Sequence, residues 1–465
     1  PIAGAPNIFN VVNLDKSQKK TPKTGWHEQT QSFFYSLELG WKSQLFVTTT
    51  GRNDWASQLA NSPQKSFFYP SVGVSWLPSS TFNFPEKFNY LKIRASWASV
   101  ANPFPRELTI ATHPYDDTIS GWDDKSNYPI GQLYPERTKT WELGFDARFL
   151  HGFTLSASWY RADTYNQTFN PNLSASSGYS DIYIQTGHVR NTGVEASLGY
   201  DHQWKNWNWN SQFTFSWNKN KIIELCKEWY NPITEETITM NRLQISKLGR
   251  AKFILKEGGS MGDLYSTTDL RRDDKGNIEI DEGGNVVVED NLPDMKLGSV
   301  FPDYNLAWRN SVSWKNLNLG FLVTARIGGI VNSLTQANMD LFGVSEATAA
   351  ARDAGGALVN GRSLVNPETW YTAIASQGGI PQYYTYSATN VRLQELSLGY
   401  TIPRKWLHNI CSITVSFVGR NLWMMYCKAP FDPEAVASTN NFYQGMDYFM
   451  MPSTRNLGFN INIKF

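Results

Sequence analysis

Residues 457–465 at the end of the chain read Leu-Gly-Phe-Asn-Ile-Asn-Ile-Lys-Phe, an unbroken alternation of apolar side chains with polar or small ones. Successive side chains of a β-strand point to opposite faces, so this stretch predicts a strand that is apolar on one face and polar on the other. A soluble sandwich and a membrane barrel both use such strands. The number of copies, and the segments that separate them, therefore decide between the two folds.

The same alternation recurs through most of the chain. Its apolar phases fall within the ranges Phe33–Leu39, Phe68–Trp76, Leu91–Trp97, Trp141–Phe149, Phe153–Trp159, Val194–Tyr200, Trp207–Trp217, Tyr304–Trp308, Leu317–Ala325 and Ile413–Phe417. The opposite phases carry charged residues, namely Lys92, Arg94, Glu142, Asp146, Arg148, Glu195, Arg309, Arg326 and Lys464. A dry sandwich interior would reject these charges, whereas a water-filled lumen accepts them. In one strand the apolar phase changes between Leu393 and Leu396, which predicts a bulge near Glu395.

The connections between these strands alternate in length. Tight ones occur at Gly40–Trp41, Leu150–Gly152 and Asn316, and long ones at Ala101–Tyr134, Thr168–Gln185, Cys226–Pro302, Ile327–Ala388 and Met424–Thr454. We therefore predict an all-β, antiparallel transmembrane β-barrel with short periplasmic turns and long extracellular loops. The count is about thirteen strands, or fifteen if Thr237–Leu264 adds a hairpin. Because an odd set does not close by antiparallel pairing alone, we expect strands and a plug from a preceding segment to complete the barrel.

Composition excludes several other classes of protein. Hydrophobic residues make up 41% of the chain, yet no apolar run approaches the roughly 18 residues of a membrane-spanning helix. The 42 basic and 41 acidic residues are evenly spread, so the net charge of +1 leaves no electrostatic footprint for nucleic acid. Aromatic residues reach 14%, which indicates membrane girdles or sugar-binding platforms. We interpret Trp159, Trp209 and Trp217 as anchors at the lipid–water interface.

Several longer runs, in their order along the chain, resemble the SusC/RagA-like TonB-dependent transporters. They are Phe68–Val72, Leu91–Trp97, Pro135–Phe145, Asn191–Glu195, Asn390–Pro403, Val418–Trp423, Phe431–Glu434 and Pro452–Phe459. The resemblance covers residues 1–465 but only the C-terminal part of the family pattern, which in full places a plug inside a 22-stranded barrel. The plug domain and first barrel strands have no counterpart here.

This resemblance implies a protein of the bacterial outer membrane that imports oligosaccharides or peptides. It also implies two partners, a SusD-like surface lipoprotein that forms a lid and the TonB complex, which acts through the missing N-terminal part. One acidic segment of the family looks like a calcium loop. Here Arg271 stands where the first Asp of such a loop belongs, before Asp273, Lys275 and Gly276, so we expect a solvated turn and no metal.

We expect substrate contacts in the long loops, because long loops in a β framework usually carry function. Two clusters combine aromatic rings with polar neighbours: Trp122, Asp123, Asp124 and Tyr128 in one, and Trp370, Tyr371, Tyr383, Tyr384 and Tyr386 in the other. A ring stacks on a sugar face while carboxylates and amides bond its hydroxyls. Contact with a lid protein and plain loop packing remain alternatives for each cluster. For Arg94 and Arg420 we expect lumenal positions, paired either with plug carboxylates or within the wall.

No catalytic set emerges from the sequence. The six His residues are scattered, and the carboxylate pairs Asp116/Asp117 and Asp123/Asp124 suit solvated turns better than acid–base chemistry. We therefore expect neither enzymatic activity nor a cofactor. The alternatives to an importer are a secreted or surface β protein that binds or cleaves glycans, and a passive porin without energy coupling.

Overall fold

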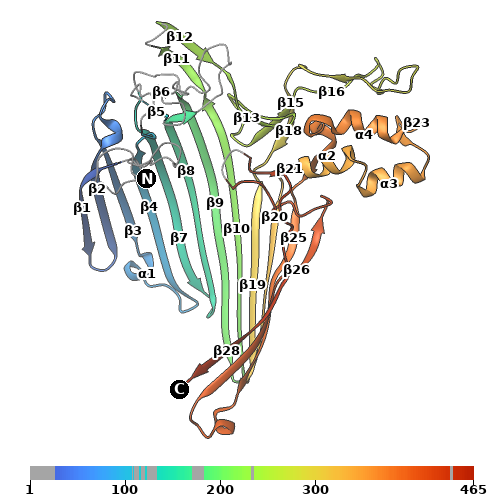
Figure 1. Ribbon diagram of the computed structural model, residues 1–465. Coiled ribbons are helices and arrows are strands. Elements are labelled where there is room, and N and C mark those ends of the chain that lie inside the picture. Colours follow the sequence, from blue (N-terminus) through green and yellow to red (C-terminus); the bar gives the residue numbers. More distant parts are fainter. Residues whose placement is uncertain are drawn as a thin grey trace, which may run out of the picture.

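The computed structural model describes residues 27–106, 108, 115–116, 121–122, 133–169, 183–231, 235–439 and 443–465. Its main feature is a single curved wall, a 13-stranded antiparallel sheet in which sequence neighbours pair in order (Figure 1). The wall consists of β1 (Thr30–Trp41), β2 (Leu45–Ala56), β3 (Phe67–Trp76), β4 (Phe88–Asn102), β7 (Glu136–Phe149), β8 (Phe153–Phe169), β9 (Ile184–Trp204), β10 (Trp207–Glu224), β19 (Tyr304–Trp314), β20 (Leu317–Ile327), β25 (Asn390–Ile402), β26 (Ser412–Cys427) and β28 (Asn456–Lys464).

The wall has the two faces that the alternation predicts. Pairing registers such as Leu319 opposite Leu398 and Phe417 opposite Phe459 place the apolar phases of neighbouring strands on the same outer face. Large side chains there have no covering layer, and Phe459 is 78% exposed. The predicted antiparallel wall with one apolar and one polar face is confirmed, and an outer face of this kind suits contact with lipid.

The predicted bulge in β25 is confirmed and lies at Gln394, next to Glu395. On the β20 side, Leu322 pairs with Glu395 and Val323 with Leu393, so Gln394 has no opposite residue. The register against β26 shifts at the same point. A residue inserted in this way changes the parity of the strand, so both Leu393 and Leu396 remain on the outer face.

The two rims of the wall differ as the sequence predicts. One rim carries the short connections, with the 3-10 helix η7 (Arg404–Leu407) and the short helix α1 (Pro78–Thr81) as the most elaborate of them. The other rim carries the long connections (Figure 1). The proposed hairpin within Thr237–Leu264 forms, as β13 (Arg242–Leu248) and β14 (Ala251–Lys256), but it belongs to a separate four-stranded sheet above the wall. Within the described residues the wall therefore has thirteen strands, and β1 and β28 are its open edges.

The long connections contain the remaining elements. The connection between β10 and β19 holds β11 (Cys226–Asn231), β12 (Glu236–Met240), β13, β14, β15 (Asp263–Ser266), β16 (Asp269–Leu270), β17 (Val288–Glu289) and β18 (Met295–Ser299). The connection between β20 and β25 holds β21 (Ile330–Ser333), α2 (Leu334–Leu341), α3 (Glu346–Asp353), β22 (Ala357–Val359), β23 (Ser363–Val365), α4 (Pro367–Ala375), η5 (Ser376–Gly378), η6 (Pro381–Tyr383) and β24 (Thr385–Ser387). Three other connections on the same rim hold η3 (Ser57–Leu59), β5 (Tyr115–Asp116) with β6 (Gly121–Trp122), and β27 (Met446–Asp447).

Parts of two long connections fold together into an outward lobe, which we call the loop lobe and define as residues 269–289 and 330–387. Side-chain caps begin its helices, because Ser333, Ser345 and Asn366 each accept hydrogen bonds from the first turn that follows. Helices α2 and α4 pack on the β16–β17 arm around a common apolar core. In the described part of the chain, no helix has both the length and the apolar character that crossing a bilayer requires.

Candidate functional site

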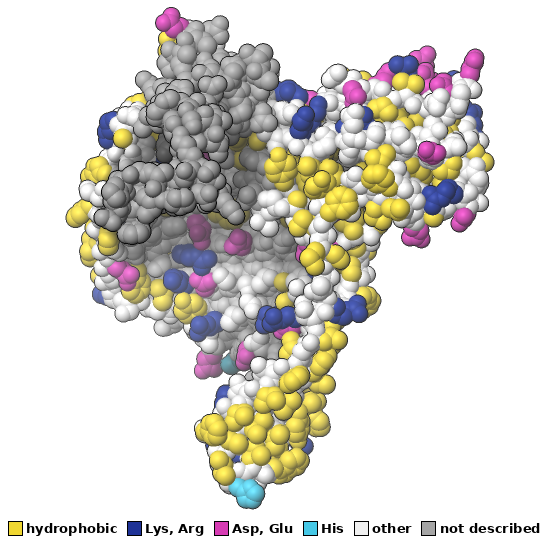
Figure 2. All heavy atoms as spheres, viewed as in Figure 1, with side chains coloured by type: hydrophobic (Ala, Val, Ile, Leu, Met, Phe, Trp, Pro, Cys, Tyr) yellow, Lys and Arg dark blue, Asp and Glu magenta, His cyan; other side chains and the backbone are white. Residues whose placement is uncertain are grey.

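The concave face of the wall forms a polar recess of about 740 Å³. Strands β4, β8, β9, β10, β19, β20 and β25 line it, and Figure 2 shows charged side chains gathered in the hollow while hydrophobic ones cover the projecting ends of β26 and β28. Its charged and amide-bearing residues are Arg94, Glu195, Asn305, Arg326, Gln394 and Glu434. The sequence placed Arg94, Glu195 and Arg326 on this face. A recess with hydrogen-bonding groups and both signs of charge suits a hydrated, polar ligand.

Charges on the concave face pair with one another inside the wall. Arg94 donates from Nη1 to Asp146 at 2.8 Å and lies 3.5 Å from Glu142. Arg420 on β26 lies 3.2 Å from Glu395 on β25. The expected lumenal positions of Arg94 and Arg420 are confirmed, and pairing within the wall accounts for these contacts.

Four residues of the second predicted aromatic cluster, Trp370, Tyr371, Tyr383 and Tyr384, come together in the core of the loop lobe, whereas Tyr386 packs against Phe431 in a separate apolar cluster. Trp370 lies on α4 and meets the ring of Tyr383 edge-on at a centroid distance of 5.9 Å. Trp370, Tyr371 and Tyr383 are half-buried and pack on the core of the lobe. Each of these rings is therefore covered on one side by the lobe and keeps part of its surface open to contact with another molecule.

Tyr384 stands apart from its neighbours because its side chain is only 1% exposed. Its hydroxyl donates to Asp340 Oδ2 at 2.9 Å, and burial, reinforced by the Asp340 carboxylate, raises the pKa of Tyr384 far above its usual value. The same two causes raise the pKa of Tyr386 to about 12. Tyr384 therefore acts on any ligand only indirectly, by fixing helix α2 and the rings around it.

The first predicted cluster is described only in part. Residues 121–122 pair with residues 115–116 in the β5–β6 ribbon, with Trp122 opposite Tyr115, above the long-connection rim. Asp123, Asp124 and Tyr128 lie outside the described residues. The two clusters thus belong to different long connections on the same rim.

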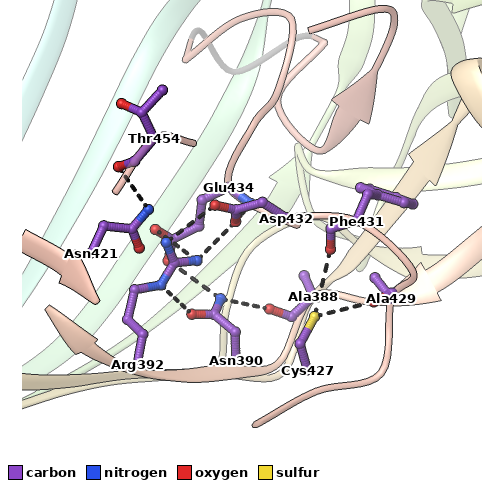
Figure 3. Close-up of polar contacts among 10 residues, drawn as sticks. All are labelled: Ala388, Asn390, Arg392, Asn421, Cys427, Ala429, Phe431, Asp432, Glu434 and Thr454. Carbon is purple, nitrogen blue, oxygen red and sulfur yellow. Dashed lines mark hydrogen bonds and ion pairs between the residues drawn. The ribbon is translucent and has the colours of Figure 1, made fainter. Parts of the chain in front are cut away.

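The structure adds a buried polar clamp that the sequence did not single out (Figure 3). Arg392 on β25 donates from Nη2 to Asp432 Oδ1 at 2.8 Å and from Nη1 to Asp432 Oδ2 at 3.3 Å. Their side chains are only 5% and 9% exposed. Glu434 lies 3.4 Å from the Arg392 guanidinium, and Asn390 accepts from Arg392 Nε. The clamp ties the connection after β26 to the inner face of the wall, and Glu434 also lines the recess.

The electrostatics of the clamp favour the ionised form of the Asp432 carboxyl group. Burial alone would raise the pKa of Asp432, but hydrogen bonds led by those from Arg392 lower it below the usual range. Two of the longer runs in the sequence, Asn390–Pro403 and Phe431–Glu434, are therefore in direct contact. One signal was present in the sequence, because Arg392 lies on the opposite phase from the lipid-facing Val391 and Leu393.

The segment that resembles a calcium loop folds as a closed turn. The Asp273 carboxylate accepts hydrogen bonds from the backbone of Lys275 and Asn277 and from the Asn277 amide. Arg271 pairs with Glu289 at 2.7 Å across the β16–β17 arm. Among the residues that the structure describes, no group of three or more His, Cys, Asp or Glu is arranged to hold a metal ion.

Comparison with known proteins now assigns this architecture. Residues 3–324 match the family model described as "TonB dependent receptor-like, beta-barrel". The chain belongs to this family. Its members are β-barrel proteins of the outer membrane, and the outer face described above is accordingly the lipid-facing one.

Individual relatives agree with this assignment. TonB-dependent receptor P3 of Formosa agariphila is 27% identical over 99% of this chain and 48% of its own length. SusC of Bacteroides thetaiotaomicron is 21% identical over 81% of this chain and 38% of its own length. A solved structure of the RagAB peptide importer superposes with a TM-score of 0.72 at 19% identity, over 97% of this chain and 50% of that one.

The SusC/RagA-like resemblance is thus confirmed. The chain spans about half the length of the relatives it matches. That a plug and further strands complete the barrel stays a prediction.

Proposed function

We propose that this chain is the barrel part of an active importer for oligosaccharides or peptides, working with a SusD-like lid lipoprotein and the TonB complex. The observation that carries the proposal is the polar recess on the concave face, which lies beneath long connections on one rim only. A hydrated oligomer with hydrogen-bonding groups fits the chemistry of this lining. The chain acts as a conduit and a binding surface rather than as a catalyst.

The family and the asymmetry of the rims support the two proposed partners. The relatives are named as TonB-dependent receptors, and the matched RagAB assembly is named as a peptide importer. The loop lobe supplies a broad outward surface at which a lid can dock. In this proposal a plug occupies the lumen. Energy supplied through TonB moves the plug, and the substrate then passes through the barrel.

For substrate contact we retain Trp122, Asp123, Asp124 and Tyr128 from one connection and Trp370, Tyr371 and Tyr383 from the other, with Tyr384 as a buried support. The half-buried rings of α4 and η6 support this choice, because an aromatic ring with one face packed presents the other at little entropic cost. Peptide side chains and pyranose faces both stack on such rings. The substrate class therefore remains either glycan or peptide in the proposal.

The test uses the whole receptor in its own cells. One variant carries Trp370→Ala with Tyr371→Ala, a second carries Trp122→Ala with Asp123→Ala, and a matched control carries Trp406→Ala, an exposed tryptophan on the opposite rim. We expect the first two to lower uptake or lid affinity while the control leaves both unchanged, and heat-modifiable mobility reports folding. Unchanged uptake and lid affinity in both loop variants would reject the site.

Removal of TonB separates active import from passive diffusion. An active importer loses uptake without TonB, whereas a porin retains it. A protein that leaves the membrane fraction in soluble, monomeric form would reject both and support the secreted β protein.

A further inference from the structure

The outer face of the wall is charged in one place. On strands β7 to β10 the outward phase carries, toward the long-connection rim, six basic residues that we call the cationic belt: Arg137, Lys139, Arg161, Arg190, Lys219 and Lys221. On the outward phase of the other described wall strands, β1 to β4 and β19 to β28, no charged residue occurs. Because the charge is confined to four neighbouring strands, it indicates a binding site for a particular ligand on this part of the outer face.

The strand register places these residues in adjacent rows. Trp141 is opposite Arg161, Arg161 is opposite Thr192, and Thr192 is opposite Lys219. In the next row toward the long connections, Lys139 is opposite Asp163, Asp163 is opposite Arg190, and Arg190 is opposite Lys221. The belt is thus a continuous surface across four strands and not a set of scattered side chains.

The belt begins directly beyond lipid-facing tryptophans. Trp141, Trp159 and Trp217 share its outward phase, and each is followed toward the long-connection rim by a basic residue two positions away: Lys139, Arg161 and Lys219. Two residues of a strand span about 7 Å. Tryptophan settles at the boundary between hydrocarbon and headgroups, so the basic groups lie at the depth of the headgroups of the outer leaflet.

One carboxylate organises the belt without cancelling its charge. Asp163 accepts hydrogen bonds from Arg190 Nε at 2.7 Å and Arg161 Nε at 2.8 Å, and it also contacts His188. Its side chain is 10% exposed, whereas those of Arg161 and Arg190 are 41% and 29% exposed. The buried acid holds both guanidinium groups at the surface, which prepares them to meet an anion.

We propose that the cationic belt binds the phosphate groups of an anionic lipid headgroup in the outer leaflet of the outer membrane. Guanidinium and ammonium groups are the usual protein partners of phosphate, and the neighbouring tryptophans contact the acyl and sugar portions of the same molecule. The ligand is a membrane lipid rather than soluble phosphate, because the belt continues the lipid-facing phase and not the concave one. The belt would fix the receptor to a preferred lipid on one side of its circumference.

The experiment measures binding of bis-phosphorylated lipid A to the whole receptor in phosphatidylcholine nanodiscs. The variant replaces Lys139, Lys219 and Lys221 by Gln, which spares the contacts of Asp163. The matched control replaces Lys87, Lys205 and Lys405, exposed lysines near the opposite rim, by Gln. We expect the affinity for lipid A to fall about 10-fold to 100-fold in the belt variant and to stay unchanged in the control. Replacement of the three belt lysines by Arg should preserve binding within about threefold.

Several outcomes would overturn the proposal. Affinity that is unchanged in the Gln variant, or reduced equally in the control, would show that the belt does not bind the lipid. Equal binding of dephosphorylated lipid A would show that phosphate is not recognised, and displacement by inorganic phosphate would show a site for the free ion. Loss of a co-purifying protein with lipid binding intact would make the belt a protein contact. Heat-modifiable mobility confirms that each variant folds.

Discussion

Replacement of Arg392 by Met should release the connection after β26 from the wall. The guanidinium supplies two hydrogen bonds to a carboxylate that is only 9% exposed. A hydrogen bond to a charged group contributes about 1.5–3 kcal/mol, and removal of one partner of a buried ion pair costs about 3–5 kcal/mol. Because one of the two bonds is long, at 3.3 Å, we expect about 3 kcal/mol, which is a change of more than about 100-fold in the equilibrium for local opening.

Amide hydrogen exchange measures this opening directly. The backbone N–H of Glu434 donates to Asp432 Oδ1 at 3.0 Å, so it loses protection when Asp432 leaves its place. Exchange in peptides that cover residues 428–439 should accelerate more than about 100-fold in Arg392→Met. The double variant Arg392→Met with Asp432→Leu removes the acceptor of the Glu434 N–H, but at other amides of the segment, such as that of Ala437, which donates to the Met446 carbonyl, it should recover part of the loss, because it no longer leaves a buried carboxylate without its cation.

Arg420 provides the matched control for this experiment. It also pairs with a carboxylate across β25 and β26, but its side chain is 67% exposed. An exposed pair contributes about 0.2–1 kcal/mol, so Arg420→Met should change local exchange by no more than about fivefold. Equal effects of Arg392→Met and Arg420→Met, or unchanged exchange in the first, would refute the assignment of the clamp as the contact that holds this connection.

Three further predictions concern acidification, the lipid face and the loop lobe. The folded state lowers the pKa of Asp432. The clamp is therefore fully stabilising above the unfolded pKa of about 4 and weakens as the pH falls through the lower folded pKa. Amide exchange of residues 428–439, corrected for its intrinsic dependence on pH, should be constant at neutral pH and rise in acid. Phe459→Arg should destabilise assembly by about 2–4 kcal/mol at mid-membrane while Asn460→Arg is milder, as measured by folding into lipid vesicles; equal effects would contradict the phase of β28. Tyr384→Phe deprives the Asp340 carboxylate of a buried donor, so exchange of α2 amides should rise by the equivalent of about 1–3 kcal/mol while exchange in the wall is unchanged.

The wall was predictable because its signal is local. Each strand shows the two-residue period by itself, and a single change of parity located the bulge within one residue of Gln394. The hairpin within Thr237–Leu264 was ambiguous for the same reason. Its strands alternate too, but Leu243 pairs with Leu255 above the wall and packs on the core of a loop. Only long-range pairing, which local alternation does not encode, separates a wall strand from a loop strand.

The candidate site was less predictable, because the same residue types, Trp and Tyr, occur both at ligand-binding surfaces and in the core of a loop. The sequence grouped Tyr384 with Trp370 and Tyr371 correctly in space, yet the burial of Tyr384 depends on α2 packing behind it. The clamp was missed because Arg392 and Asp432 belong to separate runs that meet only through the fold of the connection after β26. The sequence showed the charge of Arg392 on the lumenal phase, but it did not identify Asp432 as the partner of this charge.

The connections are short on one rim and long on the other, and this difference in length has an evolutionary consequence. Direct pairing between neighbouring strands sets the register of the wall, and the entropic cost of closing a flexible loop grows only with the logarithm of its length. A lineage can therefore lengthen, exchange or diversify the connections on the long rim while the membrane-inserted part keeps its geometry. Under the proposed function, substrate preference can therefore change in evolution while the strands that insert into the membrane stay the same.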